Sequence, residues 1–137
     1  MSKVKGSCLC GGIHYESSAE PAAMALCHCT HCQKQSGSAY SALVAVPAGT
    51  LEINRSQLKF YEDKGSSGLA VRRGFCPTCG SAVLSEVAAT PGLEWIKAGT
   101  LDDTSWYQPA VSIWCDSAQH WTPLPEGMAK FPGNPPA

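Results

Sequence analysis

The spacing of the eight cysteines limits what this chain can fold into more than any other feature of the sequence. Seven of them fall into three short groups, and one stands alone towards the C-terminal end. The groups are Cys8 with Cys10, then Cys27, Cys29 and Cys32, then Cys76 with Cys79. Cysteines separated by one or two residues can turn their sulfurs toward one ion. The spacing therefore favours a fold in which these groups meet around metals.

The chain shows no targeting signal that would place it in an oxidising compartment. The opening "MSKVKGSCLCGG" has two lysines but no apolar run behind them, unlike a secretory signal. No stretch approaches the roughly 18 apolar residues of a membrane helix. We therefore expect a cytoplasmic protein with no membrane partner. In the cytoplasm thiols stay reduced, so these cysteines are expected to be metal ligands or catalytic groups before they are disulfides.

Composition indicates a single globular domain over residues 1–137. Apolar residues make up 44% of the chain and charged residues 15%, which argues against disorder. The formal net charge is −1, and a nucleic-acid partner is not expected because such proteins usually carry a basic surplus. The frequent glycines and prolines, 13 and 10, favour short strands and many turns over long helices.

Short strands separated by turns are predicted along most of the chain. Apolar alternation or short apolar runs predict strands at 41–46, 50–55, 58–62, 93–99 and 110–116. The turn sequences "PAGT", "DKGSSG", "TPG" and "LDDTS" flank or separate these segments. One helical turn is predicted at 31–37, closed by Gly37. We expect an all-β fold of antiparallel sheets, with a proline-rich irregular tail over 122–137.

The first and third cysteine groups together form a candidate structural zinc site. Cys8 and Cys10 lie two apart, so both side chains leave the same face if the segment is an extended strand. Cys76 and Cys79 form a zinc knuckle, in which Gly80 allows backbone N–H groups to point at the sulfurs. Four cysteines complete a tetrahedral ion, and its binding then adds to the folding energy. Two disulfides, or buried free thiols, are the alternative.

The middle group supplies three sulfurs from one short segment and predicts a second zinc site. Three protein ligands with one vacant position are typical of a catalytic zinc, in which water or substrate takes the fourth place. A fourth protein ligand is the alternative, and the side chains that could supply it are Cys115, His14, His28, His31 and His120. Cys115 is otherwise expected to be a buried thiol.

Several polar residues lie close to these cysteines in sequence. Lys34, Arg72 and Arg73 could offset the charge of the thiolates, or be solvated surface cations. The segment after the triplet, with Gln33, Lys34, Gly37 and Ser38, could line a pocket for a peptide-like ligand. The alternative for this segment is a helical turn with its C-terminal glycine.

Four stretches in order resemble the glutathione-dependent formaldehyde-activating enzyme family, also called the CENP-V/GFA domain family. They are "GSCLCGGIHYE", "CHCTHCQKQSGSAYSALVAVP", "GFCPTCGSAV" and "PAVSIWCDSAQHWTPLPEGMAKFP", and they cover nearly the whole chain. The resemblance implies an Mss4-like β-tent, an antiparallel β architecture. It also implies a structural zinc on Cys8, Cys10, Cys76 and Cys79, and a second, catalytic-type and loosely held zinc on Cys27, Cys29 and Cys32.

The resemblance further implies a reaction and a partner. The family's named reaction joins glutathione and formaldehyde into S-(hydroxymethyl)glutathione, a carbon–sulfur lyase reaction in reverse, so a small thiol such as glutathione is the expected partner. A metal with an open position can lower the pKa of a bound thiol or polarise an aldehyde oxygen. Three thiolate ligands donate charge to the ion, so thiol activation is the expected route. One departure from many relatives is Ser112, where they carry a histidine.

Two other classes of function compete with this interpretation. In the first, both metals are structural and the chain is a non-catalytic binding module for a small thiol or a protein partner. In the second, a DNA-binding zinc ribbon, a basic surplus is expected, yet ten basic residues face eleven acidic ones. The fourth position at the middle cysteine group separates the enzyme from the binding module.

Overall fold

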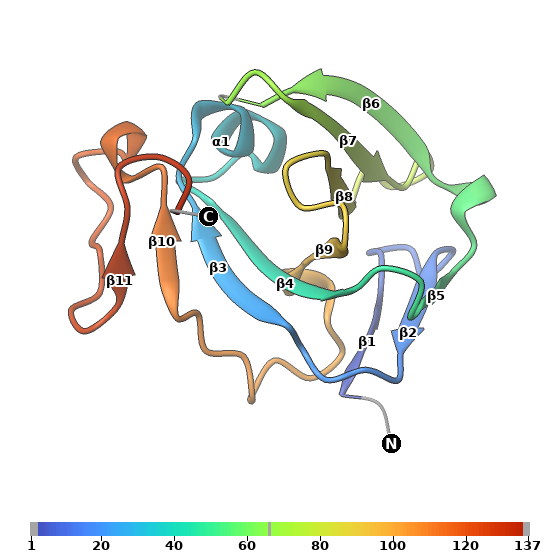
Figure 1. The fold of residues 1–137 in the computed structure, drawn as a ribbon. Helices are drawn as coiled ribbons and strands as arrows, with labels where there is room; N and C mark the ends of the chain where they lie inside the picture. Colours follow the sequence, from blue (N-terminus) through green and yellow to red (C-terminus); the bar gives the residue numbers. More distant parts are fainter. Residues whose placement is uncertain (1–2, 66, 136–137) are drawn as a thin grey trace.

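Two β-sheets of unequal size make up the fold in the computed structural model, which describes residues 3–65 and 67–135 (Figure 1). The small sheet has the order β1 (Val4–Ser7), β2 (His14–Ser17), β5 (Leu51–Ile53). The large sheet has the order β11 (Ala129–Lys130), β10 (Val111–Ile113), β3 (Ala23–Cys27), β4 (Ser41–Pro47), β9 (Leu93–Lys97), β8 (Ala82–Val87), β7 (Ala70–Phe75), β6 (Lys59–Lys64). The predicted all-β class is confirmed, and the architecture agrees with an Mss4-like fold.

Helical structure is confined to short pieces. The α-helix α1 (Thr30–Ser36) is seven residues long and ends at Gly37, whose left-handed backbone (φ 67°) forms the C-cap. Three 3₁₀ turns occupy Arg55–Gln57, Ala98–Thr100 and Cys115–Ser117. No helix in the described part of the chain has the length and apolar character needed to cross a membrane.

Each of the five predicted strand segments contains an observed strand, but three of these strands are shorter than predicted. Segment 50–55 is a strand over Leu51–Ile53 alone. Segment 93–99 leaves the sheet after Lys97, where a 3₁₀ turn begins. Segment 110–116 ends at Ile113 because Trp114 adopts a left-handed backbone (φ 57°). Alternation therefore stops before Cys115, and that thiol is half-buried rather than buried as predicted. The helical turn predicted at 31–37 is observed within one residue of its expected start.

Two further predictions need correction. The large sheet is not purely antiparallel, because β10 runs parallel to both β3 and β11. The tail, predicted irregular over 122–137, contributes the two-residue edge strand β11, and Phe131 N–H donates to the carbonyl of Ser112 beyond it. An edge position suits this proline-rich segment, because an edge strand needs to pair on one side alone. Residues 136–137 of the tail lie outside the described residues.

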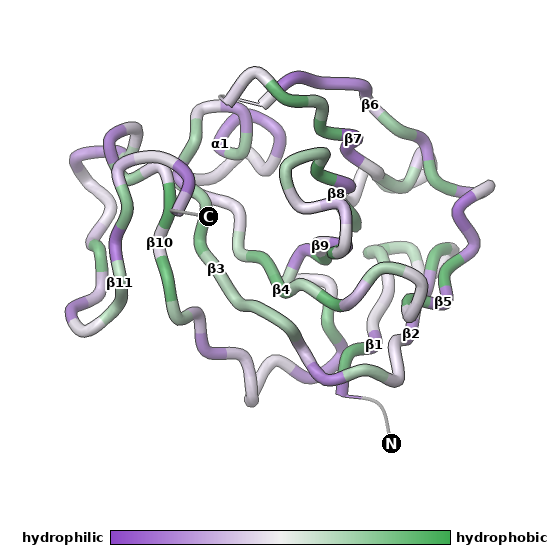
Figure 2. Tube along the Cα trace, viewed as in Figure 1, coloured by the Kyte–Doolittle hydropathy of each residue, from purple (hydrophilic) through white to green (hydrophobic). Residues whose placement is uncertain are grey.

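The main hydrophobic core lies between the two sheets. Val44, Val46, Ile96 and Leu84 of the large sheet are fully buried there. The side chains that meet them include Val4, Ile13, Tyr15, Leu51 and Leu58. In Figure 2 β3 and β10 are mainly hydrophobic, whereas β6 at the edge of the sheet is largely hydrophilic. Burial of about ten such side chains, at roughly 1.5–3 kcal/mol each, is the main stabilising contribution to the fold.

The opposite face of the large sheet is lined by a different set of residues. In the pairing register Cys27 lies opposite Ser41, and Leu43 lies opposite Lys97. Because alternate residues of a strand share a face, these side chains and that of Trp95 point to the same side of the sheet. The helix α1 follows β3 directly and lies beside the upper end of the sheet (Figure 1). This face and α1 frame the second cysteine group.

Candidate metal centres

Cys8, Cys10, Cys76 and Cys79, the four-cysteine cluster, bring two turns from different sheets together. Their sulfurs lie within 4.8 Å of one another. The Sγ atoms of Cys8 and Cys10 are 3.6 Å apart, and those of Cys10 and Cys76 are 3.8 Å apart. A tetrahedral zinc with bonds of about 2.3 Å requires sulfurs about 3.8 Å apart. The donor set therefore fits a closed tetrahedral ion.

The turn that carries Cys8 and Cys10 differs from the predicted extended strand. Cys8 N–H donates to the carbonyl of Ile13, and Gly11 N–H donates to the carbonyl of Cys8, which closes a tight turn after β1. Gly11 has a left-handed backbone (φ 80°), which a glycine adopts without strain. The chain reverses within a few residues, so the two sulfurs converge through the turn rather than through strand alternation.

Backbone and hydroxyl groups stabilise the thiolates of the four-cysteine cluster. Ile13 N–H donates to Cys8 Sγ at 3.3 Å. Ser81 lies 3.3 Å from Cys79 Sγ through its hydroxyl, and hydrogen bonds from Ser81 lower the pKa of the Cys79 thiol to about 5. Cys10 is exposed and Cys76 is buried, so the cluster lies at the surface with one side open to solvent. Such partners orient ligand sulfurs and favour their charged form.

Cys27, Cys29 and Cys32, the three-cysteine cluster, are instead all buried. Cys27 is the last residue of β3, and Cys29 is the N-cap of α1, where its Sγ accepts from Cys32 N–H at 3.3 Å. The strand end and the first helical turn thus place the three sulfurs within 4.8 Å of one another. Trp95 and Trp114 pack against the cluster and shield it from water.

No fourth ligand of the usual types completes the three-cysteine cluster within the described residues. The set of His, Cys, Asp and Glu ligand atoms lying within 4.8 Å of one another there ends at three sulfurs. The structure places the other five candidates elsewhere. His14 and His120 are exposed, His31 pairs with Asp63, the Cys115 thiol donates to the carbonyl of Ser112, and the ring of His28 lies 5.3 Å from that of Tyr40.

Two buried cations lie beside the three thiols. Lys97 is 7% exposed, and its Nζ donates to Ser41 Oγ at 2.8 Å. Arg73 is 3% exposed, and its Nη1 lies 3.9 Å from Cys32 Sγ. Its Nε donates to Asp63 Oδ2 at 2.9 Å, and His31 Nδ1 lies 2.8 Å from the same oxygen. The cluster therefore sits in a locally positive environment that favours thiolates.

The ionisation of the three thiols is strongly coupled. Hydrogen bonding from Cys27 and then from Cys32 lowers the pKa of Cys29, whereas hydrogen bonding with Cys29 raises the pKa of Cys27. Burial lowers the pKa of Lys97, and the neighbouring thiolates partly oppose that shift. The three thiols therefore do not ionise independently of one another.

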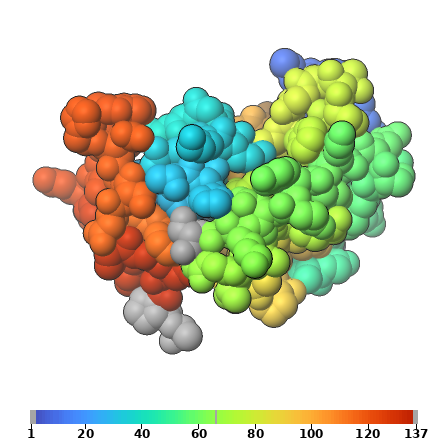
Figure 3. All heavy atoms as spheres, turned by 90° about the horizontal axis from the view of Figure 1, so that it is seen from above, coloured from blue at the N-terminus to red at the C-terminus, as the bar shows by residue number. Residues whose placement is uncertain are grey.

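The predicted pocket residues after the cluster take up different positions. Gln33 is buried, and its amide donates to the carbonyls of His28 and Ser117, while its oxygen accepts from Gln119. Lys34, Gly37 and Ser38 are exposed on α1 or just beyond it. A substrate-binding role for these four residues stays a prediction. In Figure 3 the segment around α1 is visible from above, between the C-terminal segment and the β6–β7 region.

A pocket of about 410 Å³ opens beside α1, and its lining includes Ser41, which pairs with Cys27 in the sheet, and Gly80, which follows Cys79. Its lining residues are Gln35, Ser36, Tyr40, Ser41, Ala42, Gly80, Ser81, Ala82, Lys97, Gly99 and Thr100. Lys97 and Ser41 were not among the predicted site residues. The sequence feature that could have identified Lys97 is its place in the strand segment 93–99. It lies two residues after Trp95, so the two side chains share one face of the strand. Arg73 was recognised in sequence as a possible partner of the thiolates.

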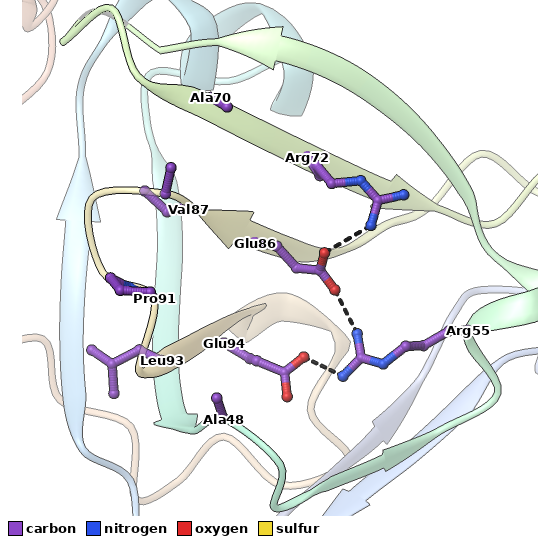
Figure 4. A pocket seen from close by; sticks show the side chains of 10 residues that line it. Ala48, Arg55, Ala70, Arg72, Glu86, Val87, Pro91, Leu93 and Glu94 are labelled. Carbon is purple, nitrogen blue, oxygen red and sulfur yellow. Dashed lines mark hydrogen bonds and ion pairs between the residues drawn. The ribbon is translucent and has the colours of Figure 1, made fainter.

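A second pocket, of about 470 Å³, is lined by ion-paired side chains (Figure 4). Arg55 pairs there with Glu94 and with Glu86, and Arg72 pairs with Glu86 at 2.9 Å. Because these charges satisfy one another, this pocket offers no free group for thiol chemistry.

Ser112 does not face the three-cysteine cluster. It is fully buried, and its hydroxyl donates to Met128 Sδ at 3.0 Å. In the register Ser112 lies opposite Leu26, one residue before Cys27, so it points to the other side of the sheet. The serine found here, where many relatives carry a histidine, therefore affects packing beneath β11 rather than the surroundings of the thiols.

Comparison with known proteins adds a family match and a structural likeness. A model of the family described as "Glutathione-dependent formaldehyde-activating enzyme" matches residues 3–117. No curated protein matches the chain. A crystal structure of a Rhodobacter sphaeroides protein is similar, with a TM-score of 0.59 and 17% identity, over 93% of this chain and 99% of that one. At such identity the likeness supports the fold alone.

Proposed function

This chain belongs to the glutathione-dependent formaldehyde-activating enzyme family, and from that premise we propose that it joins a small thiol to an aldehyde. The proposed substrates are glutathione and formaldehyde, or a related thiol–aldehyde pair, with S-(hydroxymethyl)glutathione as the product. In the opposite direction the reaction is a carbon–sulfur lyase reaction. The proposal includes zinc in both cysteine clusters and a cytoplasmic location, where thiol substrates are abundant and cysteines stay reduced.

One observation carries the proposal: the three-cysteine cluster is buried, beside a pocket, and lacks a fourth ligand of the usual types in the described residues. A structural zinc site has four protein ligands, whereas a catalytic one keeps a position for water or substrate. The four-cysteine cluster shows the closed arrangement in the same chain. The difference in ligand number supports assigning chemistry to Cys27, Cys29 and Cys32.

The residues around the cluster suit thiol addition. Cys27, Cys29 and Cys32 would hold the zinc, which would lower the pKa of a substrate thiol so that thiolate forms near neutral pH. Lys97 and Arg73 add positive charge on the same side and favour a further anion there. Trp95 and Trp114 exclude water from the cluster, which strengthens these electrostatic effects. The thiolate attacks the carbonyl carbon, a carbon–sulfur bond forms, and the carbonyl oxygen takes up a proton.

Exchange NMR on formaldehyde and glutathione, with and without zinc-loaded protein, tests the proposal. The rate of adduct formation should exceed the spontaneous rate at the same pH and thiol concentration. Cys29→Ser is the informative variant, because serine keeps the N-cap of α1 while removing a soft ligand. It should return the rate to the spontaneous value with the fold intact.

An unchanged rate with the zinc-loaded wild type would leave the binding module as the better description. That alternative predicts that the chain binds a small thiol or a protein partner without accelerating the reaction. X-ray absorption at the zinc edge separates the two. A fourth protein ligand at the three-cysteine cluster favours the binding module, and a water or exogenous thiol there favours the enzyme.

A further inference from the structure

The pocket beside α1 combines an open volume with polar groups that lack partners. Its volume of about 410 Å³ falls within the range of small-molecule sites, roughly 300–1,000 Å³. Gln35 lines it, and the Oε1 atom of this side chain is, within the described residues, buried without a hydrogen-bond partner. A buried polar atom without a partner costs about 1–3 kcal/mol unless a ligand or water satisfies it. The pocket is therefore suited to a ligand with a hydrogen-bond donor.

Lys97 supplies the complementary donor to the same pocket. Its ammonium group has three hydrogens, and Ser41 Oγ is the single hydrogen-bond partner found for Nζ among the residues that the structure describes. The side chain comes from the end of β9 and is 7% exposed, so water has little access to satisfy the remaining hydrogens. Burying an ammonium with one partner is costly, and it is retained where the charge is used.

The position of Lys97 relates the pocket to the three-cysteine cluster. Lys97 lies opposite Leu43, which packs against the three cysteines, and Ser41 lies opposite Cys27. Lys97 and Ser41 therefore line the pocket and are also, through the sheet register, neighbours of the residues that form the three-cysteine cluster. When a thiol held at the cluster attacks the carbonyl carbon of an aldehyde, the carbonyl oxygen would lie toward Lys97.

We propose that Lys97, held by Ser41, binds the oxygen of the aldehyde and of the hydroxymethyl group formed from it, with Gln35 Oε1 accepting a hydrogen bond from the hydroxyl. The inference rests on the proposed function and assigns the oxygen-binding half of the site. The sulfur–carbon bond forms, and the π electrons of the carbonyl move to its oxygen. Lys97 stabilises that negative charge by a hydrogen bond, and the oxygen takes from solvent the proton that the thiol released. No oxidant or reductant is needed.

Other charged groups of the fold do not offer the same opportunity. Arg73 is committed to Asp63, and the arginines in the pocket of Figure 4 are committed to Glu86 and Glu94. Lys97 has no carboxylate partner among the salt bridges of the described residues. A hydrogen bond from a charged donor to a growing negative charge is among the stronger catalytic contributions.

A pair of stable ligands tests the inference without requiring turnover. S-(2-hydroxyethyl)glutathione and S-propylglutathione have nearly the same shape, and one carries a hydroxyl where the other carries a methyl group. Calorimetry on zinc-loaded wild type should show about ten-fold tighter binding of the hydroxyl compound, as expected for a hydrogen bond to a charged group. Lys97→Met should bind both compounds with similar affinity. The matched control Lys5→Met changes an exposed lysine and should keep the ten-fold preference.

Zinc content and thermal unfolding establish that each variant is folded and loaded. Should Lys97→Met fail to fold, Ser41→Ala removes the group that holds Nζ and should reduce the preference for the hydroxyl compound instead.

Equal binding of the two compounds by the wild type overturns the inference and leaves the proposed function standing. If Lys97→Met still binds the hydroxyl compound about ten-fold more tightly, the inference is likewise overturned and the proposed function stands. Loss of zinc in Lys97→Met, with no hydroxyl preference in the wild type, assigns Lys97 to charge balance alone and overturns the inference. Binding of neither compound by the wild type overturns the proposed thiol chemistry and the inference with it.

Discussion

The two cysteine clusters of this chain use the same ligand atom in opposite surroundings. The four-cysteine cluster lies at the surface, with Cys10 exposed, and joins a turn of the small sheet to a turn of the large one. The three-cysteine cluster is buried on one face of the large sheet, beside Lys97, Arg73 and a pocket. The cluster with more ligands is the more exposed, so under the proposed function it is ligand number and not burial that separates the structural site from the reactive one.

The contrast has a physical basis. A tetrahedral ion with four thiolates has no position left for a reactant, so it does not bind water or substrate even where its surroundings are exposed. An ion with three thiolates keeps a position open, and competing reactions with water are limited when the site is enclosed. Arg73 and Lys97 offset charge at the buried cluster, whereas backbone N–H and the Ser81 hydroxyl do so at the surface cluster. The two sites therefore predict opposite responses to loss of one cysteine.

The largest effect is expected for Cys76→Ser in the four-cysteine cluster. Structural zinc contributes about 10–16 kcal/mol of apparent binding energy in small zinc domains, comparable with the whole stability of a domain, about 5–15 kcal/mol. The variant should lose its cooperative thermal transition and both sheets should come apart. Circular dichroism melts with zinc analysis measure this. A transition within a few degrees of the wild type would show that the cluster does not hold the sheets together.

Cys29→Ser in the three-cysteine cluster should separate metal loss from unfolding. We expect zinc content to fall from two to one per chain, while the free energy of unfolding falls by far less than in Cys76→Ser. The cluster sits within one sheet and its adjoining helix, so its metal does not join the two sheets. Elemental analysis and chemical denaturation test this. Simultaneous loss of both metals would contradict the separation of roles.

Asp63→Asn tests the charge beside the buried cluster. Asp63 pairs with Arg73, whose side chain is 4% exposed, so the variant leaves a buried cation without its carboxylate. The expected cost is about 2 kcal/mol at pH 7, between the values for exposed and for buried pairs. The pKa of Asp63 is lowered in the folded protein, because hydrogen bonds from His31 and Arg73 outweigh the opposing effect of burial.

The sign of the pH dependence follows from that lowered pKa. The stabilising contribution of Asp63 is complete above the ordinary value of 3.8 and is lost as the pH falls through the lower, folded value. The stability difference between wild type and Asp63→Asn should therefore be constant from neutral pH down to about 5 and should close in stronger acid. Denaturation curves at several pH values measure it. A difference that grows in acid would show that the pair is not formed as described.

The smallest effect is expected for Cys115→Ala, which serves as the control for all the cysteine variants. The thiol is half-buried and donates a long hydrogen bond, 3.5 Å, to the carbonyl of Ser112. Its loss should cost about 0.5–1 kcal/mol and leave the zinc content at two. A fall in zinc content would identify Cys115 as the fourth ligand of the three-cysteine cluster in solution.

Local sequence patterns predicted much of the fold, and their errors have identifiable causes. Apolar alternation located five strands, but β1, β2, β3 and β8 were not assigned from periodicity, β7, with adjacent arginines and a glycine, was missed, and β11 lies in the tail predicted irregular. The break after Ile113 depends on the left-handed backbone of Trp114, which bulky residues rarely adopt. Trp114 is held there by contacts with the tail, from its N–H to the carbonyl of Gly133 and from its ring to Asn134. Such contacts join distant segments and leave no local signal.

The sequence by itself determined the ligand chemistry of this protein. Cysteines one or two residues apart can reach a common ion whatever the rest of the chain does, so each local group was readable from spacing. The fold then brings Cys8 and Cys10 to Cys76 and Cys79. Tertiary structure decided what surrounds them. Lys97 and Arg73 reach the three-cysteine cluster because β9 and β7 lie in one sheet with β3, and Ser41 meets Lys97 because β4 pairs with β9. Strand order is set by the burial of whole sheet faces, which is a property of the assembled core and not of any short segment.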